Sequence, residues 1–178
     1  METLLVETSY ALEDRSSIVK SRAYAEWIQV VVNAARVQIH STVHKARPDI
    51  HAACHAHGIS GRAWSTFGKP LGMLVQDSYV FYNSHSVYKN FGGVVFEGAE
   101  AERLAKSLDE NRRAAILQNY GLVTTGGTVD EVEFLFQSME RLCEIQLEVE
   151  AESAVGVMEK VFLTDEAAKY TCEMARIR

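Results

Sequence analysis

Two histidines separated by a single residue are the part of this sequence best suited to chemistry. They are His55 and His57, in the run Cys-His-Ala-His-Gly at 54–58, which follows a turn at 47–49. Residues 50–55 are predicted to form a short buried strand, and side chains two apart on a strand point to the same face. The backbones of the two histidines would then lie about 7 Å apart, which lets both imidazoles approach one metal ion.

Size, charge and cysteine content narrow the class of protein. With 178 residues, 47% of them apolar, the chain is expected to fold as one domain spanning 1–178. A net charge of −6 with scattered basic residues argues against nucleic-acid binding. No apolar run predicts a membrane helix, and residues 1–10 lack the basic start of a signal peptide. Three widely separated cysteines fit reduced thiols, so we expect a cytoplasmic protein with no membrane partner.

The elements that must position the histidine pair follow from periodicity and from helix and turn signals. The first twenty residues show no clear period, which predicts a loosely ordered start. Helices are expected at 34–46, 60–67, 98–108, 128–155 and 164–176. Strands are expected at 50–55, at two or three places within 71–95, and at 114–117 and 122–125. Thr128 and Glu131 form the signature of a helix capping box. This alternation of strands and helices predicts a mixed α/β domain.

Several motifs that occur in one order resemble the class II aldolase/adducin family. They are Ile-His-Ser at 39–41, Ala-Arg-Pro-Asp at 46–49, the run at 54–58, Trp-Ser at 64–65, Gly-Lys-Pro-Leu at 68–71, Ala-Ile-Leu-Gln-Asn-Tyr-Gly-Leu at 115–122 and Gly-Gly-Thr-Val-Asp-Glu at 126–131. The resemblance covers about 34–150 and implies a three-layer α/β/α domain around a mainly antiparallel central sheet. It also implies a homo-oligomer, such as a tetramer, with the active site at a subunit boundary.

The resemblance also assigns roles to particular side chains. In metal-using members of the family the His-x-His pair supplies two ligands, which gives His55 and His57 that role. The third ligand is a histidine in an Asn-His-Gly turn, and that position is Tyr120 in this chain. An acidic acid/base residue of the family falls on Arg36. The resemblance therefore implies a divalent metal, Zn²⁺ rather than Fe²⁺, with Tyr120 and Arg36 as the catalytic side chains.

These two departures from the family pattern leave alternatives open. The third metal ligand could be Tyr120 as phenolate, His51, His85 or a residue of a neighbouring subunit. Tyr120 could instead fill the vacated ligand position as a buried aromatic, or carry a proton in acid/base steps. Arg36 could bind a carboxylate or phosphate or remain a solvated charge, but it cannot act as a general base because guanidinium stays protonated. Without a metal, the two histidines would be a hydrogen-bonded pair in a cleft.

The function that the resemblance implies is a lyase that forms or cleaves a C–C bond through a stabilised enolate. Residues 1–30 differ from the family's N-terminal part and lack its phosphate-binding turns, so a small non-phosphorylated carbonyl or polyketide-like substrate of secondary metabolism is expected. One alternative is a non-catalytic, adducin-like assembly module. Another is a metal-dependent decarboxylase or oxygenase on the same fold. We favour an enzyme over the assembly module.

Overall fold

The computed structural model describes residues 5–8, 43–45, 47–89, 98–156 and 158–176. Within them, strands form one five-stranded sheet in the order β1-β2-β5-β4-β3. The strands are β1 (Leu5–Thr8), β2 (Ala52–Ala56), β3 (His85–Tyr88), β4 (Ala114–Leu117) and β5 (Gly121–Gly126). β3 and β4 are parallel, and the other three neighbouring pairs are antiparallel. The expectation of a mainly antiparallel central sheet is therefore confirmed.

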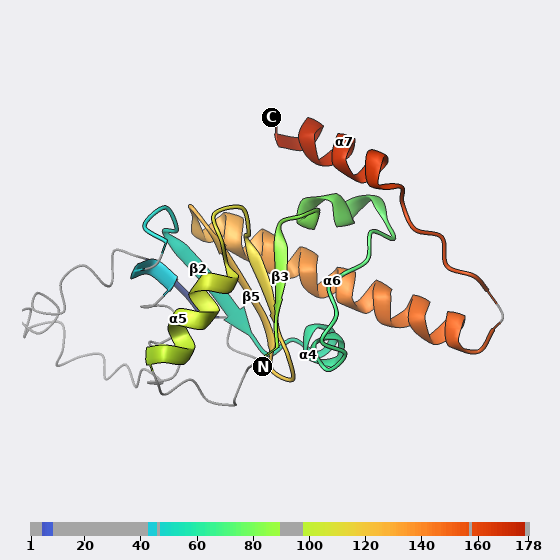
Figure 1. Ribbon diagram of the computed structural model, residues 1–178, viewed down its shortest axis with the longest axis horizontal. Coiled ribbons are helices and arrows are strands. Elements are labelled where there is room, and N and C mark those ends of the chain that lie inside the picture. The colour runs from blue at the N-terminus through green and yellow to red at the C-terminus, as the bar shows by residue number, and fades with distance from the viewer. Residues whose placement is uncertain (1–4, 9–42, 46, 90–97, 157, 177–178) are drawn as a thin grey trace, which may run out of the picture.

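Helices lie on both faces of this sheet (Figure 1). They are α4 (Ile59–Ser65), the 3₁₀ helix η2 (Gln76–Phe81), α5 (Gly98–Ser107), α6 (Val129–Ala154) and α7 (Asp165–Arg176). The alternation along β4 explains the two layers, because Ala114 and Ile116 pack in the core cluster that contains α4 and α6 side chains. Ala115 and Leu117 belong to the cluster on the other face, together with α5 side chains. The layered α/β architecture expected from the sequence is thus confirmed.

Within the described residues, two stretches differ from the expected local structure. The two or three strands expected within 71–95 reduce, in the part of that range the structure describes, to the 3₁₀ helix at 76–81 and the strand at 85–88. The 3₁₀ turn starts where the Val75 N–H meets the Ser78 hydroxyl at 3.4 Å and buries Phe81 in the core. Of the first twenty residues, which were expected to be loosely ordered, the structure describes Leu5–Thr8, and these form a strand paired with β2. The helix expected at 34–46 lies outside the described residues except for 43–45, which are helical.

The expected capping of α6 is present in a modified form. The Thr128 hydroxyl accepts the Glu131 backbone N–H at 3.1 Å. The Glu131 carboxylate reaches back and accepts the N–H of Gly127 at 2.7 Å, one residue earlier than in the usual capping box. The Gly127 and Glu131 N–H groups at this Gly-Gly-Thr turn are therefore used in capping the helix.

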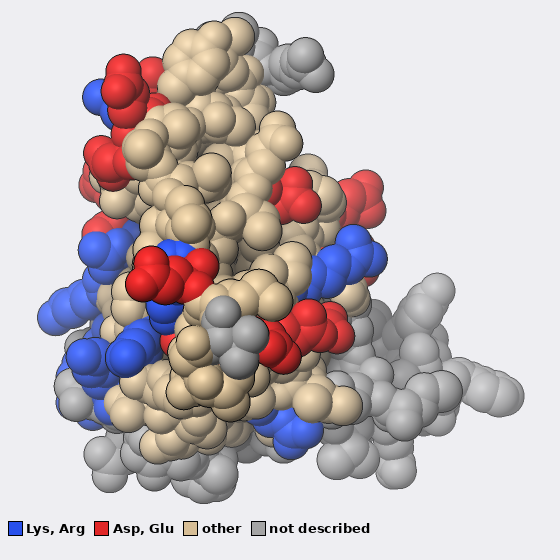
Figure 2. Space-filling view, turned by 90° about the vertical axis from the view of Figure 1, so that its right-hand side faces the viewer, with Lys and Arg blue, Asp and Glu red and all other residues tan. Residues whose placement is uncertain are grey.

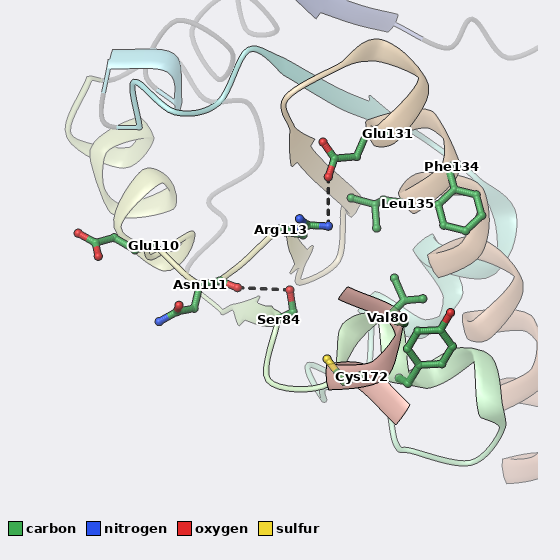
Figure 3. Close-up of a pocket in the computed structure, with 11 residues that line it drawn as sticks. Val80, Ser84, Glu110, Asn111, Arg113, Glu131, Phe134, Leu135 and Cys172 are labelled. Carbon is green, nitrogen blue, oxygen red and sulfur yellow. Dashed lines mark hydrogen bonds and ion pairs between the residues drawn. The ribbon is translucent and has the colours of Figure 1, made fainter. Parts of the chain in front are cut away.

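The C-terminal helix α7 crosses η2 and leaves a cavity beside it (Figure 3). The Tyr82 hydroxyl donates to the Asp165 carboxylate at 2.7 Å, which fixes the start of α7. The Thr164 hydroxyl caps the helix by accepting the Ala167 N–H at 3.1 Å. The described helices include none that is long and apolar enough to cross a membrane.

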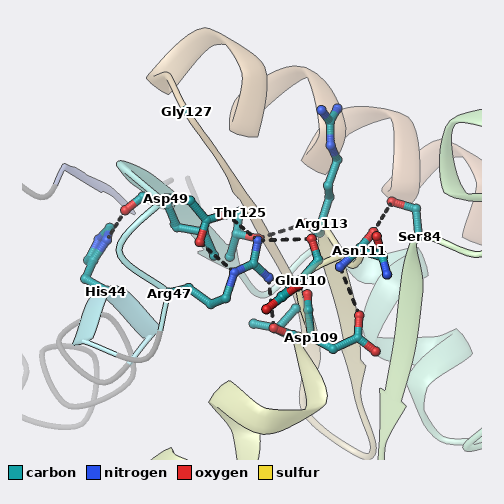
Figure 4. A network of polar contacts seen from close by, with 12 residues as sticks. His44, Arg47, Asp49, Ser84, Asp109, Glu110, Asn111, Arg113, Thr125 and Gly127 are labelled. Carbon is teal, nitrogen blue, oxygen red and sulfur yellow. Dashed lines mark hydrogen bonds and ion pairs between the residues drawn. The ribbon is translucent and has the colours of Figure 1, made fainter. Parts of the chain in front are cut away.

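Arg47 anchors the turn that leads into β2 (Figure 4). Its guanidinium is paired with the Asp49 carboxylate, with N–O distances of 2.8 and 2.5 Å. It also donates to the backbone carbonyls of Leu108, at 3.0 Å, and of Asp109 in the loop between α5 and β4. The guanidinium holds the pKa of the Asp49 carboxyl below its usual value. One side chain thus ties the entry of the histidine strand to the loop that leads into β4, two strands away in the sheet.

We expect Arg47→Ala to lower the free energy of unfolding by about 2 kcal/mol, because two carbonyls lose a charged donor. The measurement is urea unfolding followed by circular dichroism. Arg112→Ala is the matched control, since Arg112 forms a 3.3 Å ion pair with Asp109 that is open to solvent and donates to one carbonyl, that of Ser107, at 3.2 Å, so its loss should cost less, about 1 kcal/mol. Equal effects of the two variants would contradict the anchoring role of Arg47.

Candidate active site

The strand β2 carries His55 on the sheet face opposite α6. Ala52 and Cys54 pack in the cluster that contains α6 side chains, and alternation turns His55 to the other face. There His55 is paired in register with Val123 of β5 and is 6% exposed. The strand expected from the sequence thus buries one histidine of the pair.

A backbone carbonyl orients the His55 ring. Its Nδ1 lies 2.7 Å from the carbonyl oxygen of Leu122 on β5. Because a carbonyl only accepts, Nδ1 must carry the proton, and Nε2 of the neutral ring then carries the lone pair. Metal-ligating histidines are commonly oriented in this way, by donating their other ring N–H to a carbonyl.

His57 follows the end of β2 and is half-buried. The centroids of the His55 and His57 rings lie 5.2 Å apart, with an edge-to-face angle of 77°. The prediction that the two imidazoles project together is therefore confirmed.

Tyr120 reaches the same place from the turn between β4 and β5. Asn119 takes a left-handed conformation (φ 62°), and the Tyr120 N–H closes the turn on the Leu117 carbonyl at 3.0 Å. Gly121 follows with φ 151°. A Cβ at Gly121 would lie 3.3 Å from the Ala56 carbonyl oxygen, so this position keeps the turn close to the end of β2. The turn thereby brings Tyr120 against the histidines.

The Tyr120 ring contacts both imidazoles. Its centroid lies 4.9 Å from that of His55 with the rings stacked at 12°, and 4.9 Å from that of His57 at 75°. The three rings that the sequence singled out therefore form one cluster, which we call the three-ring site.

The stacking limits what Tyr120 can ligate in this arrangement. A metal held at Nε2 of His55 would need its other donors beside that nitrogen, at the edge of the imidazole. The Tyr120 ring instead lies over the face of His55, nearly parallel to it. The two neighbouring imidazoles would supply two donors for a divalent metal, whereas the stacked ring argues against Tyr120 as the third. Among the described residues no group of three or more His, Cys, Asp and Glu side chains is arranged to hold a metal ion.

Two other histidines that the sequence offered as third donors lie elsewhere. His51 is exposed, and its backbone N–H donates to the Gly126 carbonyl at 3.0 Å, at the end of β2 remote from His57. His85 begins β3, which β5 and β4 separate from β2. Its Nδ1 donates to the Phe81 carbonyl at 2.8 Å, and its Nε2 accepts the Leu71 N–H at 3.0 Å. The proposal of His85 as a ligand is wrong, because both of its ring nitrogens hold the backbone. Arg36 lies outside the described residues.

The buried His85 ring gives stability a predictable pH dependence. Burial lowers the pKa of His85 below its usual value near 6.5, so the folded protein binds this proton less readily than the unfolded chain does. The contribution of the His85 ring to the free energy of unfolding is complete above about pH 6.5, and it is lost as the pH falls from there toward the lower pKa of the folded state. We expect His85→Gln to be less stable than the wild type at pH 7.5 but to lose less further stability at pH 5. Thermal melts at the two pH values test this, and parallel losses in both proteins would contradict it.

Cys54 is a core residue, as the alternation of the strand predicted. It is fully buried, and burial raises the pKa of its thiol to about 12. A thiol this hard to ionise is a poor nucleophile at neutral pH.

The sequence did not point to Glu140, a residue of α6 that binds the start of α4 next to the site. Its carboxylate accepts the backbone N–H groups of Ser60 at 2.8 Å and of Gly61 at 2.9 Å, at the start of α4. These bonds satisfy two of the unpaired donors at the helix start, which lies directly after His57. The sequence feature that could have indicated this role is the position of Glu140 beside the apolar stripe of α6, one residue after the buried Met139.

Comparisons with known proteins identify the family of this chain. Residues 8–147 match the family model described as the Class II Aldolase and Adducin N-terminal domain. The Meiotically up-regulated gene 14 protein of Schizosaccharomyces pombe is 38% identical over 162 residues, which cover 89% of this chain and 63% of that protein. Decarboxylase NovR of Streptomyces niveus is 39% identical over 120 residues, 67% of this chain and 44% of that protein. This chain therefore spans about half the length of these relatives.

One solved structure resembles this chain in both fold and sequence. The L-fuculose 1-phosphate aldolase from Glaciozyma antarctica PI12 superposes with a TM-score of 0.69 at 35% identity, covering 81% of this chain and 52% of that chain. The family model and the relatives together establish that the chain belongs to the class II aldolase and adducin family.

Proposed function

We propose that the three-ring site is the active site of a small-molecule lyase that forms or cleaves a C–C bond through an enolate. The observation that carries this proposal is the convergence of two imidazoles and a phenol within 4.9–5.2 Å, with one imidazole oriented by a carbonyl. The relatives named as an aldolase and a decarboxylase support it, because both reaction classes make or break a bond next to a carbonyl. The substrate in this proposal is a small carbonyl compound without a phosphate group, of the polyketide-like kind found in secondary metabolism.

The roles of the side chains follow from their chemistry. A divalent cation such as Zn²⁺, held by His55 and His57, would polarise the substrate carbonyl and stabilise negative charge on its oxygen. Tyr120 carries an O–H group that can donate a proton to the developing enolate oxygen or hold it by a hydrogen bond. Arg36 is assigned the substrate's carboxylate or its oxyanion, since guanidinium binds both and stays charged.

The proposal is tested by solvent deuterium exchange, which detects enolate formation without knowledge of the product. The protein, with Zn²⁺ or Fe²⁺ added or with chelator, is mixed in D₂O with pyruvate, 2-oxobutyrate or hydroxyacetone, and the protons next to the carbonyl are followed by NMR. We expect exchange that falls on the order of 100-fold or more in His55→Gln and in His57→Gln. His51→Gln is the matched control and should exchange as the wild type does. Absence of exchange with every compound and metal, or equal rates in all variants, would contradict the proposal.

A non-catalytic assembly module, as in adducin, is the second candidate. It is favoured by the stacking of Tyr120 on His55, which places an aromatic ring where the family's third histidine belongs. Tyr120→Phe separates the two candidates, because it keeps the stacked ring and removes the hydroxyl. Loss of exchange with the fold intact supports the lyase, whereas a module would show no exchange before or after the substitution.

We also propose that the chain forms a homo-oligomer in the cytoplasm. Six large apolar side chains after α6 are largely exposed: Val155, Met158, Val161, Phe162, Tyr170 and Met174. Figure 2, which faces the end of the molecule where α6 stops, shows neutral side chains running between acidic groups. Exposed apolar surface of this kind is typical of an interface. All three cysteines are free thiols, which fits a reducing compartment. Light scattering at several protein concentrations measures the assembly.

A further inference from the structure

A cavity of about 620 Å³ lies at the end of the sheet remote from the three-ring site. Strand β5 marks the two ends of the sheet. It starts at Gly121, beside the end of β2 that leads to His57, and it stops at Gly126, which pairs with Ala52. Six residues of strand separate the two ends by about 17 Å. Two of the residues that line the cavity are Arg113, directly before β4, and Glu131, in the first turn of α6. The lyase proposal therefore makes no use of it.

Apolar side chains form one wall of this cavity (Figure 3). Val80 comes from η2, Phe134 and Leu135 from α6, and Cys172 from α7. Phe134 is 60% exposed, which is a high value for a phenylalanine beside a concave surface. Three elements thus converge to form a surface that fits a ring or a short hydrocarbon chain.

Arg113 supplies the polar end and is the one basic side chain among the described residues that line the cavity. It is 54% exposed and pairs with the Glu131 carboxylate at 3.1 Å through a single nitrogen. A guanidinium has five N–H donors in a fork that matches a carboxylate, so this contact leaves donors for a ligand.

The acidic groups of the cavity are less suited to bind a ligand. The second oxygen of Glu131 already accepts the Gly127 N–H at 2.7 Å. Figure 3 shows the carboxylate of Glu110 pointing away from the other labelled side chains. The remaining hydrogen-bonding capacity at the polar end is therefore mainly that of a donor with positive charge.

We propose that this cavity binds a small amphipathic carboxylate. Its ring or chain packs against Val80, Phe134 and Leu135, and its carboxylate is held by Arg113. The volume lies within the range of about 300–1,000 Å³ that holds small molecules in proteins. This assignment is independent of the lyase proposal, because it uses none of the residues of the three-ring site.

Two probes with the same body and opposite charge test the proposal on the full chain. They are 3-phenylpropionate and 3-phenylpropylamine, titrated separately while backbone amide shifts are followed by ¹H–¹⁵N NMR. We expect saturable shifts at Arg113, Leu135 and Cys172 with the carboxylate, with a Kd on the order of 1 mM. The amine should bind at least about 10-fold more weakly, which corresponds to losing the charged contact.

Substitutions separate the polar contact from simple apolar binding. Arg113→Gln should weaken binding of the carboxylate about 10-fold or more, whereas Arg112→Gln, which does not line this cavity, should leave it unchanged. Ala175→Phe, placed on the lining residue at the end of α7, should prevent binding of both probes. Circular dichroism checks that each variant is folded. Tighter binding of the amine, unchanged binding in Arg113→Gln, or no saturable shift with either probe would each overturn the proposal.

Discussion

Tyr120→His is expected to tighten the binding of Zn²⁺ on the order of 100-fold. A structural zinc site with four ligands gains about 10–16 kcal/mol, or roughly 3 kcal/mol for each ligand, which is about a factor of 100 in Kd. Tyr120 stands on the turn where the family carries its third histidine, and its ring centroid lies 4.9 Å from those of His55 and His57. An imidazole on this turn would add a third donor beside the two that are already together. Competition with a chromophoric zinc chelator measures the change.

Two controls keep this result specific. Tyr120→Phe removes the hydroxyl without adding a donor, so it should not increase the affinity for Zn²⁺. His55→Gln combined with Tyr120→His should remove the gain, because one of the three donors is lost. If Tyr120→His binds Zn²⁺ no better than the wild type, the three positions do not form the ligand set, and the metal-based version of the lyase proposal is wrong.

Glu140→Ala is expected to lower the free energy of unfolding by about 3 kcal/mol. Two backbone N–H groups at the start of α4 would lose a charged acceptor at 2.8 and 2.9 Å, and such bonds contribute about 1.5–3 kcal/mol each before relaxation and solvation. Glu140→Gln keeps one oxygen as acceptor and should lose roughly half as much. Urea unfolding curves provide the comparison.

The control for Glu140 lies one turn further along the same helix. Glu144 is exposed, and Glu144→Ala should change stability by less than about 0.5 kcal/mol. Because α4 begins directly after His57, Glu140→Ala should also broaden or shift the NMR signals of the His57 ring. A stable Glu140→Ala variant with an unchanged His57 signal would show that the helix start is held by other contacts.

Much of the fold could be predicted from the sequence because its signals are local. The helix at 129–154 was indicated by Thr128 and Glu131 at its start and by a wide apolar stripe, and the strand at 114–117 by an apolar run between turn residues. The family resemblance also implied a mainly antiparallel sheet, which the register of β2, β4 and β5 confirms. No strand forms at 76–81, because aromatic and β-branched residues also suit a short 3₁₀ helix, in which Phe81 is buried.

The candidate site was predictable in its members but not in its geometry. Alternation placed His55 and His57 together, and the family turn added Tyr120. Nothing local could show that the Tyr120 ring would stack on His55, since that depends on the left-handed Asn119 and on the close approach at Gly121. Glu140 was missed for a similar reason, because it lies 79 and 80 residues from the backbone groups it binds.

The most direct test of the three-ring site is a long-range ¹H–¹⁵N NMR spectrum of the histidine side chains during titration with Zn²⁺. We expect the His55 ring to carry a proton on Nδ1, and we expect Nε2 of His55 and a ring nitrogen of His57 to shift together at one equivalent of metal. His51 and His85 should keep their signals at that point. A His55 proton on Nε2, or zinc-dependent shifts confined to His51 or His85, would contradict the account.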